Sequence, residues 1–202
     1  MKKYLIFSFV SILFFTQYCQ ALTLEQLQQR FSQYSVIRAN FIQDRTIQGF
    51  NQSLHSTGKM IISKDLGLWW QQQTPFVMTL KMNEQRMQQI VGQQPAQIIS
   101  ADDQPQLFQF NTLLAAIFNA DRTTLEKNFQ LNLSESELDQ QWQLVLIPQS
   151  APLDKIFKQI TLNGDQYLAK IVIDDKQNDK TTIVFTEQQT SPLTEHEKRL
   201  FE

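Results

Sequence analysis

The chain has 202 residues, of which 42% are apolar and 19% are charged, with a formal net charge of −2. This length fits one domain with a sizeable core. The near-neutral charge disfavours nucleic acid or anionic lipid headgroups as the main partner, because both require a concentrated positive surface.

The N-terminal segment predicts a secretory signal peptide over residues 1–21. Two lysines precede an apolar run over 4–15 that is too short to cross a bilayer, and Cys19 and Ala21 occupy the positions that signal peptidase inspects. Cleavage after Ala21 leaves a periplasmic chain, 22–202, without cysteine and without those lysines, so its charge becomes −4. The alternative is a lipoprotein signal at Cys19, but the residues before it lack the usual leucine and small side chains.

The mature chain, a single expected domain, is predicted to begin with an amphipathic helix. Thr23 is a suitable N-cap and Gln26 completes a capping box. The apolar residues that follow recur at spacings of three and four: Leu24, Leu27, Phe31 and Tyr34.

From Val36 onward the apolar period changes to two, which predicts short antiparallel strands. In the first half, alternation places strands around 36–42, 60–62, 68–71 and 76–82. In the second half, strands are expected at Phe129–Leu133, Trp142–Ile147, Phe157–Leu162, Ala169–Ile173 and Thr181–Phe185. Asn163-Gly164 and Asp174-Asp175 have the composition of turns between them.

Two short helices are expected between these groups of strands. The segment Asn111–Ala120 is apolar nearly all round, so it cannot lie in solvent. A second helix over Thr123–Asn128 would use Thr123 as its cap.

These elements predict a mainly β fold with a few helices (α+β): an incomplete antiparallel barrel, or half-barrel, whose opening is covered by a helical lid over an apolar cavity. A sandwich, or an ordinary core without a cavity, is the alternative. The candidate lipid-binding residues share the inner face of the first strands: Met60, Ile62, Leu68, Trp70, Phe76, Met78, Leu80 and Met82. The candidate lid residues are Leu113, Leu114, Ile117 and Phe118.

The sequence shows no motif for catalysis, and no metal or cofactor is expected. His55 and His196 lie in polar surroundings, away from any metal-ligand spacing or nucleophile motif. The paired carboxylates sit beside turn residues, where acids usually shape loops. The chain is therefore not expected to be an enzyme, although an acid pair formed across the fold is left open.

Three blocks of sequence are similar to a known family. They are Val36–Gln43, the segment from Gly58 to Trp70 with Thr74-Pro75, and the C-terminal strands Trp142–Pro148, Ile160–Leu162, Ile171–Asp175 and Thr182–Phe185. In these blocks the chain resembles the periplasmic outer-membrane lipoprotein carriers, the LolA-like family. The resemblance implies an unclosed barrel that receives acylated lipoprotein or lipid from an inner-membrane transporter and delivers it to an outer-membrane acceptor.

The resemblance also implies a position that controls the lid. Family members carry an Arg-Pro pair after the strand that follows the glycine, and Lys64-Asp65 stand there in this chain. Lysine keeps the charge but lacks the planar donor fork of arginine. The protein is expected to be a monomer. Two other functions stay open: an accessory lipid- or glycolipid-binding protein of a resistance–nodulation-type exporter, and an envelope β-domain that carries nothing.

Overall fold

The computed structural model describes residues 22–103, 116–118, 121–136 and 141–202. The expected signal peptide and the candidate lid residues Leu113 and Leu114 lie outside these ranges. Within them, no helix is both long and apolar enough to cross a membrane.

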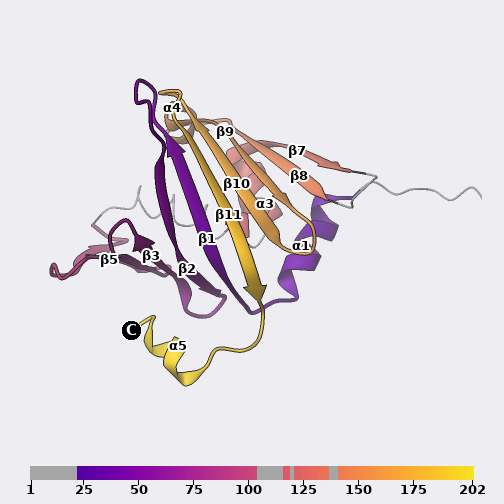
Figure 1. Cartoon of the computed structure of the whole chain (residues 1–202). Coiled ribbons are helices and arrows are strands. Elements are labelled where there is room, and N and C mark those ends of the chain that lie inside the picture. The colour runs from indigo at the N-terminus through magenta and orange to yellow at the C-terminus, as the bar shows by residue number, and fades with distance from the viewer. Residues whose placement is uncertain (1–21, 104–115, 119–120, 137–140) are drawn as a thin grey trace, which may run out of the picture.

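The described strands form one antiparallel sheet of eleven strands, in the order β6-β5-β4-β3-β2-β1-β11-β10-β9-β8-β7 (Figure 1). The strands are β1 (Val36–Thr46), β2 (Leu54–Ser63), β3 (Gly67–Thr74), β4 (Met78–Met82), β5 (Arg86–Val91), β6 (Gln97–Ser100), β7 (Phe129–Glu135), β8 (Trp142–Pro148), β9 (Phe157–Gly164), β10 (Leu168–Asp175) and β11 (Lys180–Gln189). The first and last strands of the chain pair through β1 and β11, while β6 and β7 are the two ends. The predicted open, mainly β antiparallel fold is confirmed, and the alternative of a two-sheet sandwich is wrong.

One face of the sheet, the core face, carries the main hydrophobic core. Large apolar side chains from most strands pack there against α1 (Leu24–Ser32), residues 116–118, which are helical, and α3 (Arg122–Asn128). The ring of Phe31 in α1, for example, contacts the ring of Trp142 in β8 edge to face, with the centroids 5.7 Å apart. The opposite face is called the outer face below.

The predicted cap of the first helix is correct, and the predicted cap of α3 is not. Thr23 and Gln26 form the expected capping box of α1. The Thr23 N–H donates to the Gln26 side-chain oxygen at 2.9 Å, and the Gln26 N–H donates to the Thr23 hydroxyl oxygen at 3.2 Å. In α3 the predicted cap, Thr123, is wrong, because the helix begins one residue earlier and Asp121 caps it. A carboxylate of Asp121 accepts both the N–H and the hydroxyl of Thr124, and aspartate is a stronger cap than threonine.

The turns differ from their predicted positions. Gly164 is the last residue of β9 rather than a turn residue, and it pairs with Trp142. A Cβ atom at Gly164 would lie 2.6 Å from the Trp142 ring, so the glycine permits close packing there. Asp174-Asp175 likewise end β10, and β4 begins only at Met78. The strands β5 and β6 were not predicted.

A C-terminal strap, residues 190–202, crosses the outer face of β1 to β3. It contains the short helix α5 (Glu195–Arg199) and packs Leu193, Leu200 and Phe201 against a second, smaller core. That core consists of three buried residues of the outer face: Val36, Ile61 and Trp69. The strap thus hides apolar side chains that β1 to β3 would otherwise expose.

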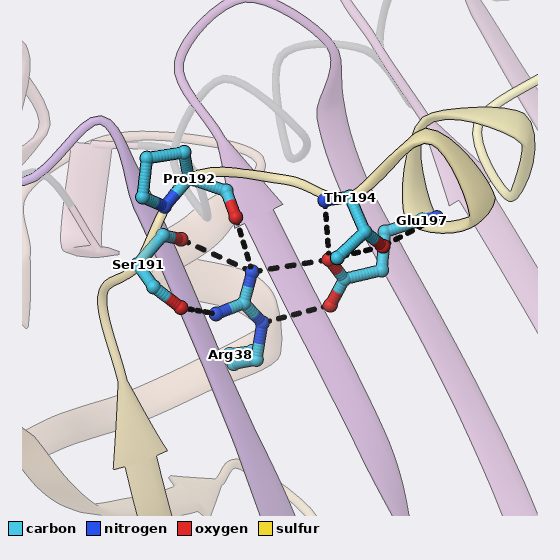
Figure 2. Close-up of polar contacts among 5 residues, drawn as sticks. All are labelled: Arg38, Ser191, Pro192, Thr194 and Glu197. Atoms are coloured by element: carbon cyan, nitrogen blue, oxygen red, sulfur yellow. Dashed lines mark hydrogen bonds and ion pairs between the residues drawn. The ribbon is translucent and has the colours of Figure 1, made fainter.

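Arg38 holds the strap by several polar contacts (Figure 2). Its guanidinium donates to the Ser191 hydroxyl at 2.6 Å, to two strap carbonyls and to Glu197 Oε2 at 3.2 Å. Its Nε also lies 2.8 Å from Glu197 Oε1, a charge contact without hydrogen-bond alignment. Burial alone would raise the pKa of Glu197, but hydrogen bonds from Thr194 and the charge of Arg38 bring that pKa below its ordinary value.

The strap is expected to loosen in acid. Because the pKa of Glu197 is lowered in the folded protein, its contribution to stability is present above the ordinary value of 4.5 and is lost as the pH falls further. Glu197→Gln should remove this dependence and, at neutral pH, speed trypsin cleavage at Lys198 roughly tenfold. Amide exchange of the strap, corrected for intrinsic rates, measures the pH profile. Glu195→Gln, which removes only an exposed pair with Lys198, is the control and should change neither readout.

Candidate functional site

An apolar pocket of about 250 Å³ lies on the core face. Its lining comes from strands of both halves of the sheet, from residues 117 and 118, and from the short helix α4 (Leu153–Ile156). The lining residues are all apolar: Leu68, Trp70, Met78, Leu80, Ile117, Phe118, Phe129, Leu153, Phe157, Ile160, Ile171, Ile173, Ile183 and Phe185. Among the described residues, no charged side chain lines the pocket.

Strand register aligns these side chains. Trp70 of β3 pairs with Leu80 of β4, and Ile171 of β10 pairs with Ile183 of β11. Residues that pair directly in an antiparallel sheet point to the same face, so each pair contributes two side chains to the wall. The β1–β11 pairing joins the two groups, because the chain ends meet in the middle of the sheet.

An aromatic cluster supports one side of the pocket. The ring of Trp70 stacks on that of Phe41, with the centroids 3.8 Å apart. The rings of Trp70 and Phe185 lie nearly perpendicular, with the centroids 6.4 Å apart. The rings of Phe118 and Phe185 also pack together, with the centroids 5.8 Å apart. Phe41 in turn lies against Gly58, where a Cβ atom would be 2.6 Å from the ring and 2.0 Å from the carbonyl oxygen of Gln71. The absence of a side chain at Gly58 therefore sets the position of two aromatic rings.

Six of the candidate residues from the sequence lie in the pocket wall, and the other described ones do not. Those in the wall are Leu68, Trp70, Met78, Leu80, Ile117 and Phe118. Met60 and Met82 are buried elsewhere, and Ile62 packs against the main core. Phe76 precedes β4 and is 56% exposed, because the predicted strand starts two residues later than expected.

Lys64 lies away from the pocket, in the turn between β2 and β3. Its ammonium group donates to the carbonyl oxygen of Ser32, the last residue of α1, at 2.6 Å. This contact ties a turn of the sheet to the first helix.

The sequence analysis missed the larger part of the described wall, which comes from the C-terminal half of the chain. These residues are Phe129, Leu153, Phe157, Ile160, Ile171, Ile173, Ile183 and Phe185. Their alternation was visible, and it places most of them on one face of each strand. What the alternation could not show is that this face continues the face of β3 and β4 across the β1–β11 pair.

The described residues of the site offer apolar surface. Polar groups near it are already engaged: Gln72 donates to the carbonyl oxygen of Phe76 at 3.1 Å, and the side chain of Gln89 contacts the sulfur of Met78 at 3.3 Å. Among the described residues, no group of three histidine, cysteine or acidic side chains could hold a metal. The described wall is suited to binding a hydrocarbon.

Comparison with solved structures finds several proteins of similar shape at low sequence identity. A LolA superfamily protein from Nitrosomonas europaea is 8% identical, with a TM-score of 0.48 and coverage of 90% of this chain and 98% of that chain. A DUF1329 family protein from Desulfovibrio piger is also 8% identical, with a TM-score of 0.50 and coverage of 89% and 94%. A chain of the MucA/MucB complex of Pseudomonas aeruginosa is 16% identical, with a TM-score of 0.40 and coverage of 88% and 58%. The likeness to the DUF1329 protein concerns the fold alone.

Comparison at the level of sequence identifies the family. No curated protein matches the chain. Residues 17–186, however, match the family described as outer membrane lipoprotein carrier protein LolA-like. This match spans every strand from β1 to β10 and most of β11. The chain therefore belongs to the LolA-like family of outer membrane lipoprotein carrier proteins, whose members work in the periplasm.

Proposed function

We propose that the protein carries acyl chains of a lipoprotein or lipid between the inner-membrane machinery and an outer-membrane acceptor. The observation that carries this proposal is the pocket wall, in which every described residue has an apolar side chain. Exposing a sixteen-carbon chain to water costs on the order of 12 kcal/mol, at ~0.8 kcal/mol per methylene. A carrier that crosses an aqueous compartment must offset that cost, and an apolar pocket does so.

Two groups of residues have distinct roles in this proposal. The cargo contacts the wall residues of β3 and β4, together with those of β11. They are Leu68, Trp70, Met78, Leu80, Ile183 and Phe185. The helical segment at 116–118 acts as part of a lid, because Ile117 and Phe118 are buried and line the pocket, and Phe118 contacts the aromatic cluster. Lys64 restrains the lid indirectly, by holding the β2–β3 turn against α1.

The size of the pocket supports a lid that moves. Its 250 Å³ exceeds the roughly 150 Å³ of an apolar cavity that binds benzene, so part of an acyl chain fits as the pocket stands. A longer chain needs the space that Ile117 and Phe118 fill, so cargo and lid compete for the same apolar surface. That competition keeps cargo affinity moderate, which lets transfer to an acceptor proceed downhill without an energy source.

Titration of the mature chain with a fluorescent long-chain fatty acid tests the proposal. Binding should be saturable, and an unlabelled long-chain fatty acid should displace the probe while acetate does not. Absence of saturable binding would contradict the proposal and favour an envelope domain that carries nothing. Mass spectrometry of organic extracts from protein purified natively from the periplasm identifies the cargo. Acylated lipoprotein is the expected finding, and glycolipid would instead favour an accessory role beside an exporter.

A further inference from the structure

Of the eight exposed large apolar side chains in the described part of the chain, five lie at one end of the sheet. Among the described residues, those at this end are Phe50, Leu54, Phe76, Val77 and Ile156. Phe50, in the turn between β1 and β2 at the top of Figure 1, is the most exposed of them at 70%. Strand pairing explains the location, because the β1–β2, β3–β4 and β5–β6 turns of an antiparallel sheet all fall at the same end.

These three turns contain no charged residue and no histidine. We call them the uncharged rim: residues 46–54, 73–78 and 91–97. The rim combines apolar side chains with glutamine, asparagine, serine and threonine, in a chain that is 19% charged. The neighbouring β10–β11 turn, residues 176–179, is different, since it contains Lys176 and Asp179 and lies between Asp174-Asp175 and Lys180. The lack of charge thus belongs to the β1–β6 side of this end.

Hydrogen bonds hold the rim in place. The Gln48 N–H donates to a carboxylate oxygen of Asp179 at 2.9 Å, and the Asn178 amide donates to the Gln48 side chain at 2.7 Å. The Gly92 N–H donates to the carbonyl oxygen of Val77 at 2.8 Å, which joins the β3–β4 and β5–β6 turns. The rim therefore presents its apolar side chains in a defined arrangement rather than on free loops.

We propose that the uncharged rim is a membrane-contact surface, with Phe50, Leu54 and Val77 entering the headgroup region of a lipid bilayer. Apolar side chains gain by leaving water at that boundary, and the amides of the rim hydrogen-bond to headgroups. A surface without charges enters the boundary without dehydrating an ion. The absence of lysine and arginine means that this contact does not depend on anionic lipid.

The shape of the rim favours a bilayer over a protein groove. Its large exposed apolar side chains stand on two separate turns, 46–54 and 73–78, and both tips can touch one flat, fluid surface. A protein partner would need a matched recess for each tip. The rim also adjoins the pocket, because Val77 precedes Met78, which lines the pocket wall. Contact at the rim thus brings the pocket to the membrane from which a hydrocarbon chain enters or leaves.

Vesicle flotation with the mature chain tests the rim independently of the pocket. The protein should float with vesicles of pure phosphatidylcholine, equally at low and high salt. Phe50→Ser combined with Val77→Ser should weaken this binding by about tenfold or more. Leu66→Ser is the matched control, because Leu66 is an exposed apolar residue of the β2–β3 turn, at the opposite end of the sheet. It should bind vesicles as the natural chain does, and circular dichroism should show all three proteins folded.

Three results would overturn the membrane-contact proposal. They are failure of the natural chain to float, binding that appears only with phosphatidylglycerol and disappears in salt, and full binding by the double variant. Uptake of a soluble fluorescent fatty acid without vesicles separates this proposal from the carrier function. The double variant should keep that uptake, since neither residue lines the pocket. If the natural chain floats with vesicles but takes up no fatty acid, the carrier function is contradicted and the membrane-contact proposal is not.

Discussion

Leu80→Glu is expected to reduce binding of a fluorescent long-chain fatty acid by roughly a hundredfold or more. The Leu80 side chain lines the pocket, whose described wall contains no positively charged group that could neutralise a carboxylate. A hydrocarbon chain entering the variant would have to strip water from that charge, which costs several kcal/mol, and each 1.4 kcal/mol is a factor of ten. Leu80 is partly exposed, so the carboxylate stays hydrated in the empty protein and the fold should survive.

Thr79→Glu provides the matched control. Thr79 precedes Leu80 in β4, is also partly exposed and points to the outer face, where its hydroxyl accepts a bond from Gln71. The same new charge on the opposite face should leave probe affinity within about twofold, since nothing in the pocket changes. Equal loss of binding in both variants would show that the charge acts through stability rather than through the pocket. Unchanged binding in Leu80→Glu would place the cargo elsewhere.

Gly58→Ala is expected to lower both stability and probe affinity. The added Cβ atom would meet the Gln71 carbonyl oxygen at 2.0 Å and the Phe41 ring at 2.6 Å, and the backbone contact cannot be relieved by rotation of a side chain. Overpacking of this kind usually costs about 1–3 kcal/mol of unfolding free energy. Because Phe41 stacks on Trp70, a displaced Phe41 ring pushes Trp70 toward the pocket and reduces its volume.

Urea unfolding and probe titration together test this coupling. Phe41→Leu in the Gly58→Ala background should recover part of the lost affinity, since the smaller side chain leaves room for the new methyl group. The double-mutant cycle should therefore show a coupling energy above about 0.5 kcal/mol. Additive effects would mean that the glycine is needed only for the backbone contact with Gln71.

Local patterns in the sequence were sufficient for the elements whose signals are short-range. The capping box at Thr23 and the alternation after Val36 predicted α1 and most of the strands, and the amphipathic pattern of Trp70 and Leu80 placed both on one face. Boundaries were less predictable where several residues compete for one role. Asp121 caps α3 in place of Thr123, and Gly164 stays in β9 because its lack of a side chain admits Trp142.

Sequence by itself determined the composition of each strand face, the open mainly β architecture and the family, because these follow from periodicity and ordered apolar blocks. Only the tertiary structure decided which faces meet. The β1–β11 pairing sets Ile183 and Phe185 beside the wall of β3 and β4, and the strap packs Phe201 onto an outer face that alternation would leave in water. Both arise from contacts between residues more than a hundred positions apart, and the chain's local pattern is the same whether or not those contacts form.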